Sequence, residues 1–230
     1  MHAIVLAGGR GIRLGHLTRE VPKPMVPVGG RPFLAFVLDR LVDSGFQRIT
    51  LSVGYLAQVI QDHFGFVYRG ADLRYSVERE VLGTGGAIRH ALHDRGDEPA
   101  LVVNGDTLLQ ADFSAIARWY EQEPAPVAIV LRRMDDVGRY GAVALEGDRV
   151  TGFLEKGRTG PGWINAGVYV VTPALFAQMD LPRVFSFETD VLQRHCATLR
   201  PRGLVSDAWF IDIGIPADLE RARLELPAPA

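Results

Sequence analysis

The feature that most constrains this chain is a buried strand that runs directly into a glycine-rich loop. Residues 3–6 read Ala-Ile-Val-Leu, an unbroken apolar run, and residues 7–11 read Ala-Gly-Gly-Arg-Gly. A strand without polar alternation is typical of a parallel sheet that is covered on both faces. Glycines after such a strand allow backbone N–H groups to turn towards an anion. The opening segment therefore predicts an α/β protein with a phosphate site at the edge of its sheet.

Strand and helix signals alternate up to about residue 122 and then change. The early apolar runs predict strands at residues 3–6, 49–53, 73–78 and 101–104. Helical spacing predicts helices at residues 32–44, 56–64, 87–92 and 112–120. The second half predicts an antiparallel group of strands at residues 127–131, 140–145, 150–154 and 168–171. Helices are expected again at residues 173–178, at residues 187–196 and from residue 216, with a last strand at residues 209–213.

These patterns predict one α/β domain over residues 1–226, with two halves and a disordered tail at residues 227–230. Residues 1–110 are expected to bind a nucleotide, and residues 111–226 are expected to bind the second substrate. Strands in the first half are expected to be parallel, because each is followed by a helix that can carry the chain back across the sheet.

Composition excludes several classes of protein. The 25 basic and 27 acidic residues give a net charge of −2, which argues against a nucleic-acid partner. No apolar run approaches the roughly 18 residues that cross a membrane. The amino terminus lacks the basic segment of a signal peptide, so we expect a cytoplasmic protein with no membrane partner. The single cysteine, Cys196, excludes an intrachain disulfide and a cysteine-rich metal site.

Two familiar phosphate-binding motifs do not match the glycine-rich loop. A Walker A loop requires Gly-x4-Gly-Lys-Ser/Thr, and the chain contains no such string. A dinucleotide fingerprint requires a small residue where Leu14 stands and an acidic residue after the second strand, which ends Val53-Gly54-Tyr55. A hydride-transferring dehydrogenase is therefore disfavoured. Arg10 and Arg13 add positive charge to the loop, which favours a polyphosphate ligand.

Lys23 stands between two prolines, about ten residues after the loop. The prolines stiffen the backbone and fix the direction of the amine. A lone lysine in a turn is usually an exposed surface residue. Beside a loop of glycine and arginine, Lys23 is better interpreted as a second phosphate ligand.

Six motifs in order resemble the signature of the sugar-1-phosphate nucleotidylyltransferases. The first runs from Leu6 to Leu14 and is followed by Pro-Lys-Pro-Met. The others are Leu82-Gly83-Thr84-Gly85-Gly86-Ala87, Val103-Asn104-Gly105-Asp106-Thr107, Phe153-Leu154-Glu155-Lys156, Asn165-Ala166-Gly167 and Phe210-Ile211-Asp212-Ile213-Gly214. The resemblance implies a Rossmann-like mixed, mainly parallel sheet flanked by helices, with a small antiparallel substrate lobe. It also implies Mg²⁺-dependent transfer of a nucleoside monophosphate from a nucleoside triphosphate to a sugar 1-phosphate.

The resemblance also implies roles for individual residues. Catalysis would fall to Arg13, Lys23 and Asp106. The nucleotide would be bound by Leu6, Ala7, Gly8, Gly9, Gly11, Arg13, Lys23, Gly83, Thr84, Gly86 and Asp106. The sugar phosphate would be bound by Asn104, Gly141, Glu155, Lys156, Asn165 and Glu188. Mg²⁺ would be held by Asp106 and Asp212, since hard carboxylate oxygens suit this ion.

Alternative interpretations remain for some of these residues. Each aspartate taken alone is more often a helix cap or a turn residue. Glu188 can be an ordinary acidic residue in the first turn of a helix. Ile12 stands where many relatives have threonine, so a hydroxyl contact is absent there. His90 and His93 lie three apart on a predicted helix, with no third metal ligand nearby in the sequence.

Within the family, several strings are most similar to guanylyltransferases that act on D-glycero-α-D-manno-heptose 1-phosphate. They include Leu-Gly-Thr-Gly-Gly-Ala-Ile-Arg and Trp-Phe-Ile-Asp-Ile-Gly-Ile-Pro. A mannose 1-phosphate guanylyltransferase and an N-acetylmuramate 1-phosphate uridylyltransferase are the alternatives within this class. A non-catalytic nucleotide-sugar-binding protein is the alternative from another class. The likeness also implies a homodimer and a product used for bacterial surface polysaccharide.

Overall fold

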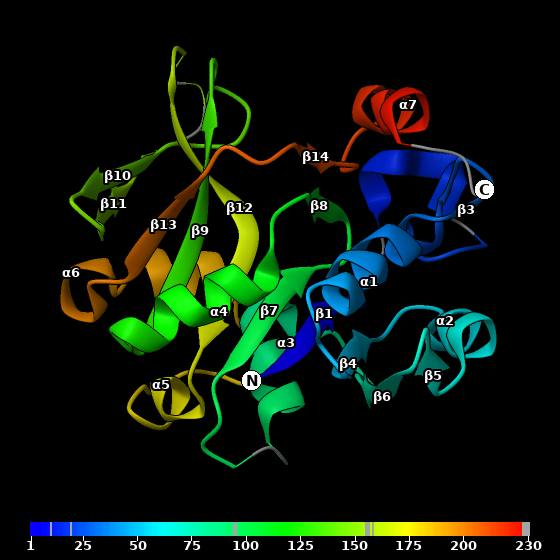
Figure 1. Ribbon diagram of the computed structural model, residues 1–230, viewed down its shortest axis with the longest axis horizontal. Coiled ribbons are helices and arrows are strands. Elements are labelled where there is room, and N and C mark those ends of the chain that lie inside the picture. Colours follow the sequence, from blue (N-terminus) through cyan, green and yellow to red (C-terminus); the bar gives the residue numbers. More distant parts are fainter. Residues whose placement is uncertain (10, 19, 94–95, 155–156, 158, 227–230) are drawn as a thin grey trace.

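A ten-stranded mixed sheet forms the centre of the computed structural model, which describes residues 1–9, 11–18, 20–93, 96–154, 157 and 159–226. Figure 1 shows helices α1 and α4 on one side of this sheet and α3 on the other. The strand order is β10-β11-β13-β9-β12-β7-β1-β4-β6-β5. Within β1 (His2–Leu6), Ala3 and Val5 pack into one core cluster while Ile4 packs into the other. An apolar run without alternation is therefore explained by burial of both faces of the strand.

The first half confirms the predicted parallel arrangement. Strand β1 pairs in parallel with β4 (Arg48–Val53) and β7 (Ala100–Asn104), and β4 pairs in parallel with β6 (Ala71–Val77). The connecting helices are α1 (Phe33–Asp43), α2 (Ala57–Phe64), α3 (Gly83–Leu92) and α4 (Phe113–Gln122). The carboxyl ends of β1 and β7 lie side by side, which places the loops after them together.

The second half supplies antiparallel strands that continue the same sheet. Strand β12 (Gly162–Val171) pairs antiparallel with β7 and with β9 (Val127–Met134). The hairpin of β10 (Val143–Glu146) and β11 (Arg149–Phe153) extends this edge. Among the strands that were not predicted are β13 (Arg202–Ser206), which runs parallel to β9, and the short β5 (Val67–Tyr68).

A separate two-stranded sheet joins segments that lie far apart in the chain. Strand β8 (Thr107–Leu109) pairs antiparallel with β14 (Phe210–Asp212). Asp212 lies opposite Thr107 in this pairing, and the Ile213 N–H donates to the Asp106 carbonyl at 3.0 Å. The pairing therefore brings the two predicted metal-binding aspartates to one place.

The boundaries of several helices differ from the prediction. Helix α3 begins at Gly83 rather than at residue 87, so the glycine run forms its first turn. A Cβ at Gly85 would lie 2.2 Å from the Phe185 ring, so close packing outweighs the poor helix propensity of glycine. The segment predicted as one helix at residues 187–196 is a π-helix, Phe187–Gln193, followed by α6 (Cys196–Leu199).

The remaining elements are short or lie near the carboxyl terminus. They are η1 (Ile12–Thr18), η2 (Lys23–Met25), β2 (Pro27–Val28), β3 (Arg31–Pro32), α5 (Pro173–Ala177) and α7 (Pro216–Glu225). The predicted tail at residues 227–230 lies outside the described residues. Among the helices of the described part of the chain, none is both long enough and apolar enough to span a membrane.

Candidate functional site

A cavity of about 240 Å³ opens at the carboxyl ends of β1 and β7. This is the edge at which open α/β sheets bind ligands. Its lining combines the glycine-rich loop, the Lys23 segment, the start of α3 and the loop after β7. The lining residues are Leu6, Gly8, Gly9, Lys23, Pro24, Glu78, Val81, Gly83, Thr84, Ala87, Asn104 and Asp106.

The glycine-rich loop packs too tightly to accept side chains at two positions. Gly11 has a φ of +65°, and a Cβ there would lie 2.7 Å from the Cβ of Lys23. The Thr18 hydroxyl donates to the Gly11 carbonyl at 3.1 Å and fixes this turn. A Cβ at Gly8 would lie 2.8 Å from Glu78 Oε1. Gly11 therefore lets the loop pack against Lys23, and Gly8 leaves room for the Glu78 carboxylate.

Lys23 lies buried between the two predicted metal-binding aspartates. Its Nζ donates to Asp106 Oδ2 at 2.5 Å and lies 3.5 Å from Asp212 Oδ1. The lysine comes from η2. Asp106 lies in the loop that follows β7, and Asp212 is the last residue of β14. Three segments that are distant in the sequence thus converge on one charged centre.

Two carboxylates meet the charges of Lys23 and Arg13 at this centre. Burial raises the pKa of Asp212, and the negative charge of Asp106 raises it further. Lys23, the Gly214 N–H at 2.7 Å and the charge of Arg13 act in the opposite direction. Two carboxylates at the edge of this cavity suit Mg²⁺, which binds to one or two carboxylates together with substrate phosphates. Among the described residues, no group of three or more metal-binding side chains occurs.

The far side of the cavity offers polar groups from both halves of the chain. Asn104 Oδ1 is buried, and no donor from the described residues bonds to it. A buried acceptor without a partner is costly, so this oxygen is suited to a ligand hydroxyl or a water. Asn165 and Glu188 lie behind the cavity and are connected through Tyr169, which accepts from Asn165 Nδ2 at 2.8 Å and donates to Glu188 Oε1 at 3.2 Å.

Several predicted site residues lie elsewhere or outside the described residues. Ala7 is fully buried beneath the cavity, and its N–H donates to the Ser52 carbonyl. Gly86 faces the Arg183 carbonyl. Gly141 is not part of the cavity lining; its loop approaches β14, where the Tyr140 and Phe210 rings lie 6.0 Å apart. The predictions for Arg10, Glu155 and Lys156 concern residues outside the described part of the chain.

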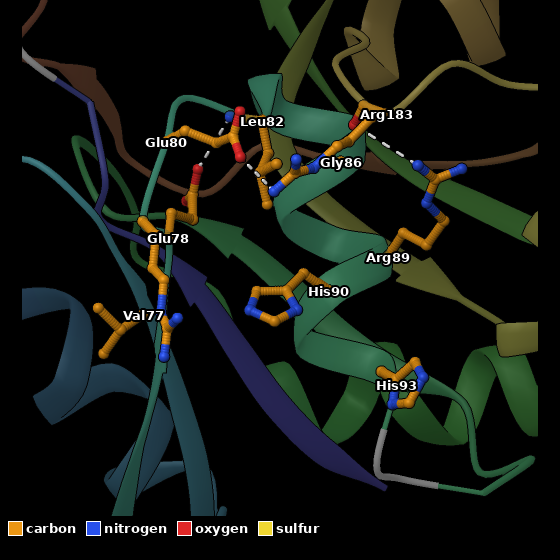
Figure 2. A pocket seen from close by; sticks show the side chains of 10 residues that line it. Val77, Glu78, Glu80, Leu82, Gly86, Arg89, His90, His93 and Arg183 are labelled. Carbon is orange, nitrogen blue, oxygen red and sulfur yellow. Dashed lines mark hydrogen bonds and ion pairs between the residues drawn. The ribbon is translucent and has the colours of Figure 1, made fainter.

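Glu78 is the cavity residue that the sequence analysis did not single out. Its Oε1 accepts from the Ser52 hydroxyl at 3.2 Å, and its Oε2 accepts from the Leu82 N–H at 3.3 Å. Figure 2 shows Glu78 reaching from the end of β6 towards Leu82 at the start of α3. Burial raises its pKa. An acidic residue at the end of a predicted strand was the available signal.

A larger hollow of about 620 Å³ lies beyond the same loop, between β6 and α3. Figure 2 shows His90 and His93 on the helix that forms one wall. Both histidines are exposed, and Arg183 at the rim is already paired with Glu80. This hollow lacks the glycine loop, Lys23 and both aspartates, so the smaller cavity is the better candidate for chemistry.

The chain is similar to known proteins over nearly its whole length. The family model described as nucleotidyl transferase matches residues 2–228. The chain belongs to the nucleotidyl transferase family. Its Rossmann-like fold is shared with a crystal structure of HddC from Yersinia pseudotuberculosis complexed with GMP-PN. That chain is 35% identical, has a TM-score of 0.85, and is matched over 98% of this chain and 99% of its own length.

Two further members of the nucleotidyl transferase family match nearly the full chain. A D-glycero-alpha-D-manno-heptose 1-phosphate guanylyltransferase of Aneurinibacillus thermoaerophilus is 40% identical and is matched over 98% of both chains. The protein of the same description from Campylobacter jejuni is 39% identical over 95% of this chain and 96% of its own. The predicted membership of a sugar-phosphate nucleotidyltransferase family is thereby confirmed.

Proposed function

We propose that the chain is a Mg²⁺-dependent guanylyltransferase that converts GTP and D-glycero-α-D-manno-heptose 1-phosphate into GDP-heptose and pyrophosphate. The observation that carries the reaction class is the Lys23 ammonium between Asp106 and Asp212 at the edge of a glycine-lined cavity. The choice of heptose and GTP is supported by similarity over nearly the full length to enzymes with this description.

The reaction requires positioning and charge neutralisation rather than acid–base chemistry. A phosphate oxygen of the sugar phosphate attacks the α-phosphorus of GTP, and the bond to the β-phosphate oxygen breaks as pyrophosphate leaves. The attacking oxygen is already anionic at neutral pH, so no general base is needed. Two polyanions must be held in line while charge builds on the leaving group. A single displacement without a covalent intermediate meets these requirements.

The nucleotide half supplies the cations and donors for the triphosphate. The backbone of the glycine loop would face the phosphates, with Arg13 and Lys23 adding positive charge. Arg13 belongs at this centre because its charge acts on Asp212. Asp106 and Asp212 would hold Mg²⁺, which supplies charge stabilisation at the phosphates when it is bound.

The sugar half supplies polar groups for the hydroxyls and the phosphate of the acceptor. Asn104 offers its buried acceptor Oδ1, and Asn165 and Glu188 lie behind it. The other proposed ligands are Gly141, Glu155 and Lys156. A sugar phosphate between this group and the glycine loop would meet GTP at the aspartate pair.

Glu78 is the group that we propose selects guanine. Guanine presents an N1–H and an amino group side by side, and a carboxylate can accept from both. The two oxygens of Glu78 are held by Ser52 and Leu82 and retain further acceptor capacity. Uracil presents a single ring N–H, so it gains less from this carboxylate.

Pyrophosphate release tests this proposal. GTP, UTP, ATP, CTP and dTTP are each offered with Mg²⁺ and D-glycero-α-D-manno-heptose 1-phosphate. The proposal predicts release with GTP alone, and mass spectrometry of the product should identify GDP-heptose. The same assay with mannose 1-phosphate and N-acetylmuramate 1-phosphate tests the alternatives. Preferential release with either of these sugars would contradict the heptose assignment.

A further inference from the structure

A continuous chain of side-chain hydrogen bonds connects Thr84, in the first turn of α3, to the sugar side of the site. Thr84 Oγ1 donates to Glu188 Oε2 at 2.6 Å. Tyr169 OH donates to Glu188 Oε1 at 3.2 Å. Asn165 Nδ2 donates to Tyr169 OH at 2.8 Å. Both oxygens of Glu188 are thus engaged, one towards each half of the molecule.

Tyr169 is the middle member of this chain, and it is held rigidly. Its side chain is 1% exposed, and its ring meets the Phe187 ring edge to face at 5.1 Å. Burial and the charge of Glu188 raise its pKa well above the ordinary value. The hydroxyl therefore keeps its proton and remains a donor to Glu188.

The local shape of β12 places Asn165 and Tyr169 against each other. The register with β9 shifts between these two residues, which marks a bulge in the strand. Gly167 within the bulge has a φ of +69°, and its N–H donates to Asn165 Oδ1 at 2.9 Å. Bulges commonly redirect side chains next to active sites, and this one turns Asn165 towards the tyrosine hydroxyl.

The Thr84 end of the chain is fixed in the same way. Thr84 Oγ1 accepts from the Phe187 N–H at 2.9 Å, so this hydroxyl is both donor and acceptor. A Cβ at Gly83 would lie 2.4 Å from the Phe185 carbonyl oxygen, which shows how closely the loop rests on this segment. Thr84 also lines the cavity. A ligand that contacts Thr84 and moves its hydroxyl will therefore act on Glu188.

We infer that Tyr169 is a positioning residue which, through Glu188, couples nucleotide binding at Thr84 to sugar-phosphate binding at Asn165. The inference rests on the proposed function, because it takes those two residues as the ends of the two substrate sites. Tyr169 touches neither substrate in this account. It holds Glu188 and Asn165 in one hydrogen-bonded unit, so that a nucleotide contact at Thr84 changes the position of both residues and raises the affinity for the second substrate.

The coupling is measured as the affinity for the sugar phosphate with and without bound nucleotide. Isothermal titration gives the Kd for D-glycero-α-D-manno-heptose 1-phosphate in Mg²⁺, alone and with saturating α,β-methylene-GTP. For the wild type we expect binding to be about fivefold or more tighter with the nucleotide. In Tyr169→Phe, which keeps the ring and removes the hydroxyl, we expect this ratio to fall to near one.

Tyr120→Phe is the matched control. Tyr120 is also buried, at 2% exposed, and its hydroxyl makes one hydrogen bond, to the Ala125 carbonyl at 2.7 Å. It lies on α4, away from the cavity lining. Tyr169→Phe removes two buried hydrogen bonds and Tyr120→Phe removes one, so a merely structural effect of losing buried hydrogen bonds would lower the ratio in both variants. The inference predicts that Tyr120→Phe keeps the wild-type ratio.

A second variant tests the chain from its other end. Thr84→Val keeps the shape of the side chain and removes the hydroxyl that donates to Glu188. We expect it to lower the coupling ratio, and we expect little further loss in the double variant with Tyr169→Phe. Thr84→Ser keeps the hydroxyl, so it should retain the wild-type coupling ratio.

The outcomes separate this inference from the proposed function. A wild type that binds neither ligand and releases no pyrophosphate overturns the proposed function and the inference together. A wild type that binds and turns over both substrates, but without coupling, overturns the inference alone. So does a Tyr169→Phe variant whose coupling ratio equals that of the wild type.

Discussion

The two halves of the site are built by different means. On the nucleotide side, the groups come from the loop after β1, from η2 and from the first turn of α3, and Gly8 and Gly11 allow close packing against Glu78 and Lys23. On the sugar side, Asn165 and Glu188 come from a bulged strand and a π-helix and meet only through Tyr169. The nucleotide side therefore depends on local backbone shape, whereas the sugar side depends on contacts between distant segments.

This difference predicts where substitutions act. The aspartate pair belongs to both halves, because Asp106 follows β7 and Asp212 ends β14. Substitution of either aspartate should reduce kcat, which is the rate with both substrates bound. Changes on one side should alter the KM of one substrate and spare the other.

The largest effect is expected at the shared centre. Asp106→Asn removes a carboxylate from the proposed Mg²⁺ site and from the Lys23 ion pair. We expect kcat to fall by about 10²–10³, as is typical when a preorganised charge is lost from an active site. Thermal unfolding should show that the fold is retained.

Asp112→Asn is the control for this substitution. Asp112 caps α4 by accepting from the Ser114 and Ala115 N–H groups, and asparagine caps helices about as well. Its kcat should equal that of the wild type. A near-wild-type kcat for Asp106→Asn in Mg²⁺ would contradict the role of Asp106 as a ligand of the metal ion.

A smaller effect, confined to the sugar side, is expected for Lys156→Ala. The family resemblance places this lysine on the phosphate of the sugar phosphate, where it would add a charge-assisted contact. We expect the KM for the sugar phosphate to rise by about tenfold or more, since each 1.4 kcal/mol of lost binding is tenfold. The KM for GTP should change little. An effect on the KM for GTP alone would contradict this role.

Glu78→Gln should act on base selection. The substitution replaces one carboxylate oxygen by a donor, which would face the donors of guanine. We expect the KM for GTP to rise by about tenfold, the usual size for a lost hydrogen bond to a charged group. The Kd for UTP, measured by titration calorimetry, should change much less, and equal losses of GTP and UTP binding would argue against base recognition by Glu78.

The pH dependence should show the smallest effect. Burial raises the pKa of Glu78, so its carboxylate protonates at a higher pH than an ordinary glutamate does. As the pH falls through this raised pKa, an acceptor is lost and the KM for GTP should rise severalfold. Steady-state kinetics across the acidic range would detect this rise. Glu78→Gln, which cannot titrate, should give a flatter profile, and an unchanged profile would contradict the assignment.

The sequence predicted local features better than long-range ones. Strand β1, the glycine loop and Lys23 were recognisable because their signals lie within about 25 residues. The meeting of Asp106 with Asp212 came only from family resemblance, since the β8–β14 pairing that causes it joins distant segments. The bulge at Gly167 and the role of Tyr169 left no sequence signal, because an apolar strand normally buries a tyrosine for packing alone.

The start of α3 illustrates why element boundaries failed. Glycine is a poor helix former, so the run at residues 83–86 indicated a turn. The structure makes it helical because Phe185 occupies the space of the missing side chain at Gly85. Tertiary packing of this kind cannot be read from the local residues.

The central claim is that both halves hold their substrates at once for a single displacement at the aspartate pair. Exchange of radiolabelled pyrophosphate into GTP tests it most directly, with Mg²⁺ and with or without the sugar phosphate. For a single displacement we expect label in GTP only when D-glycero-α-D-manno-heptose 1-phosphate is present, because the reverse reaction then runs through GDP-heptose. Label in GTP without any sugar phosphate would reveal a covalent guanylylated enzyme and would contradict the account.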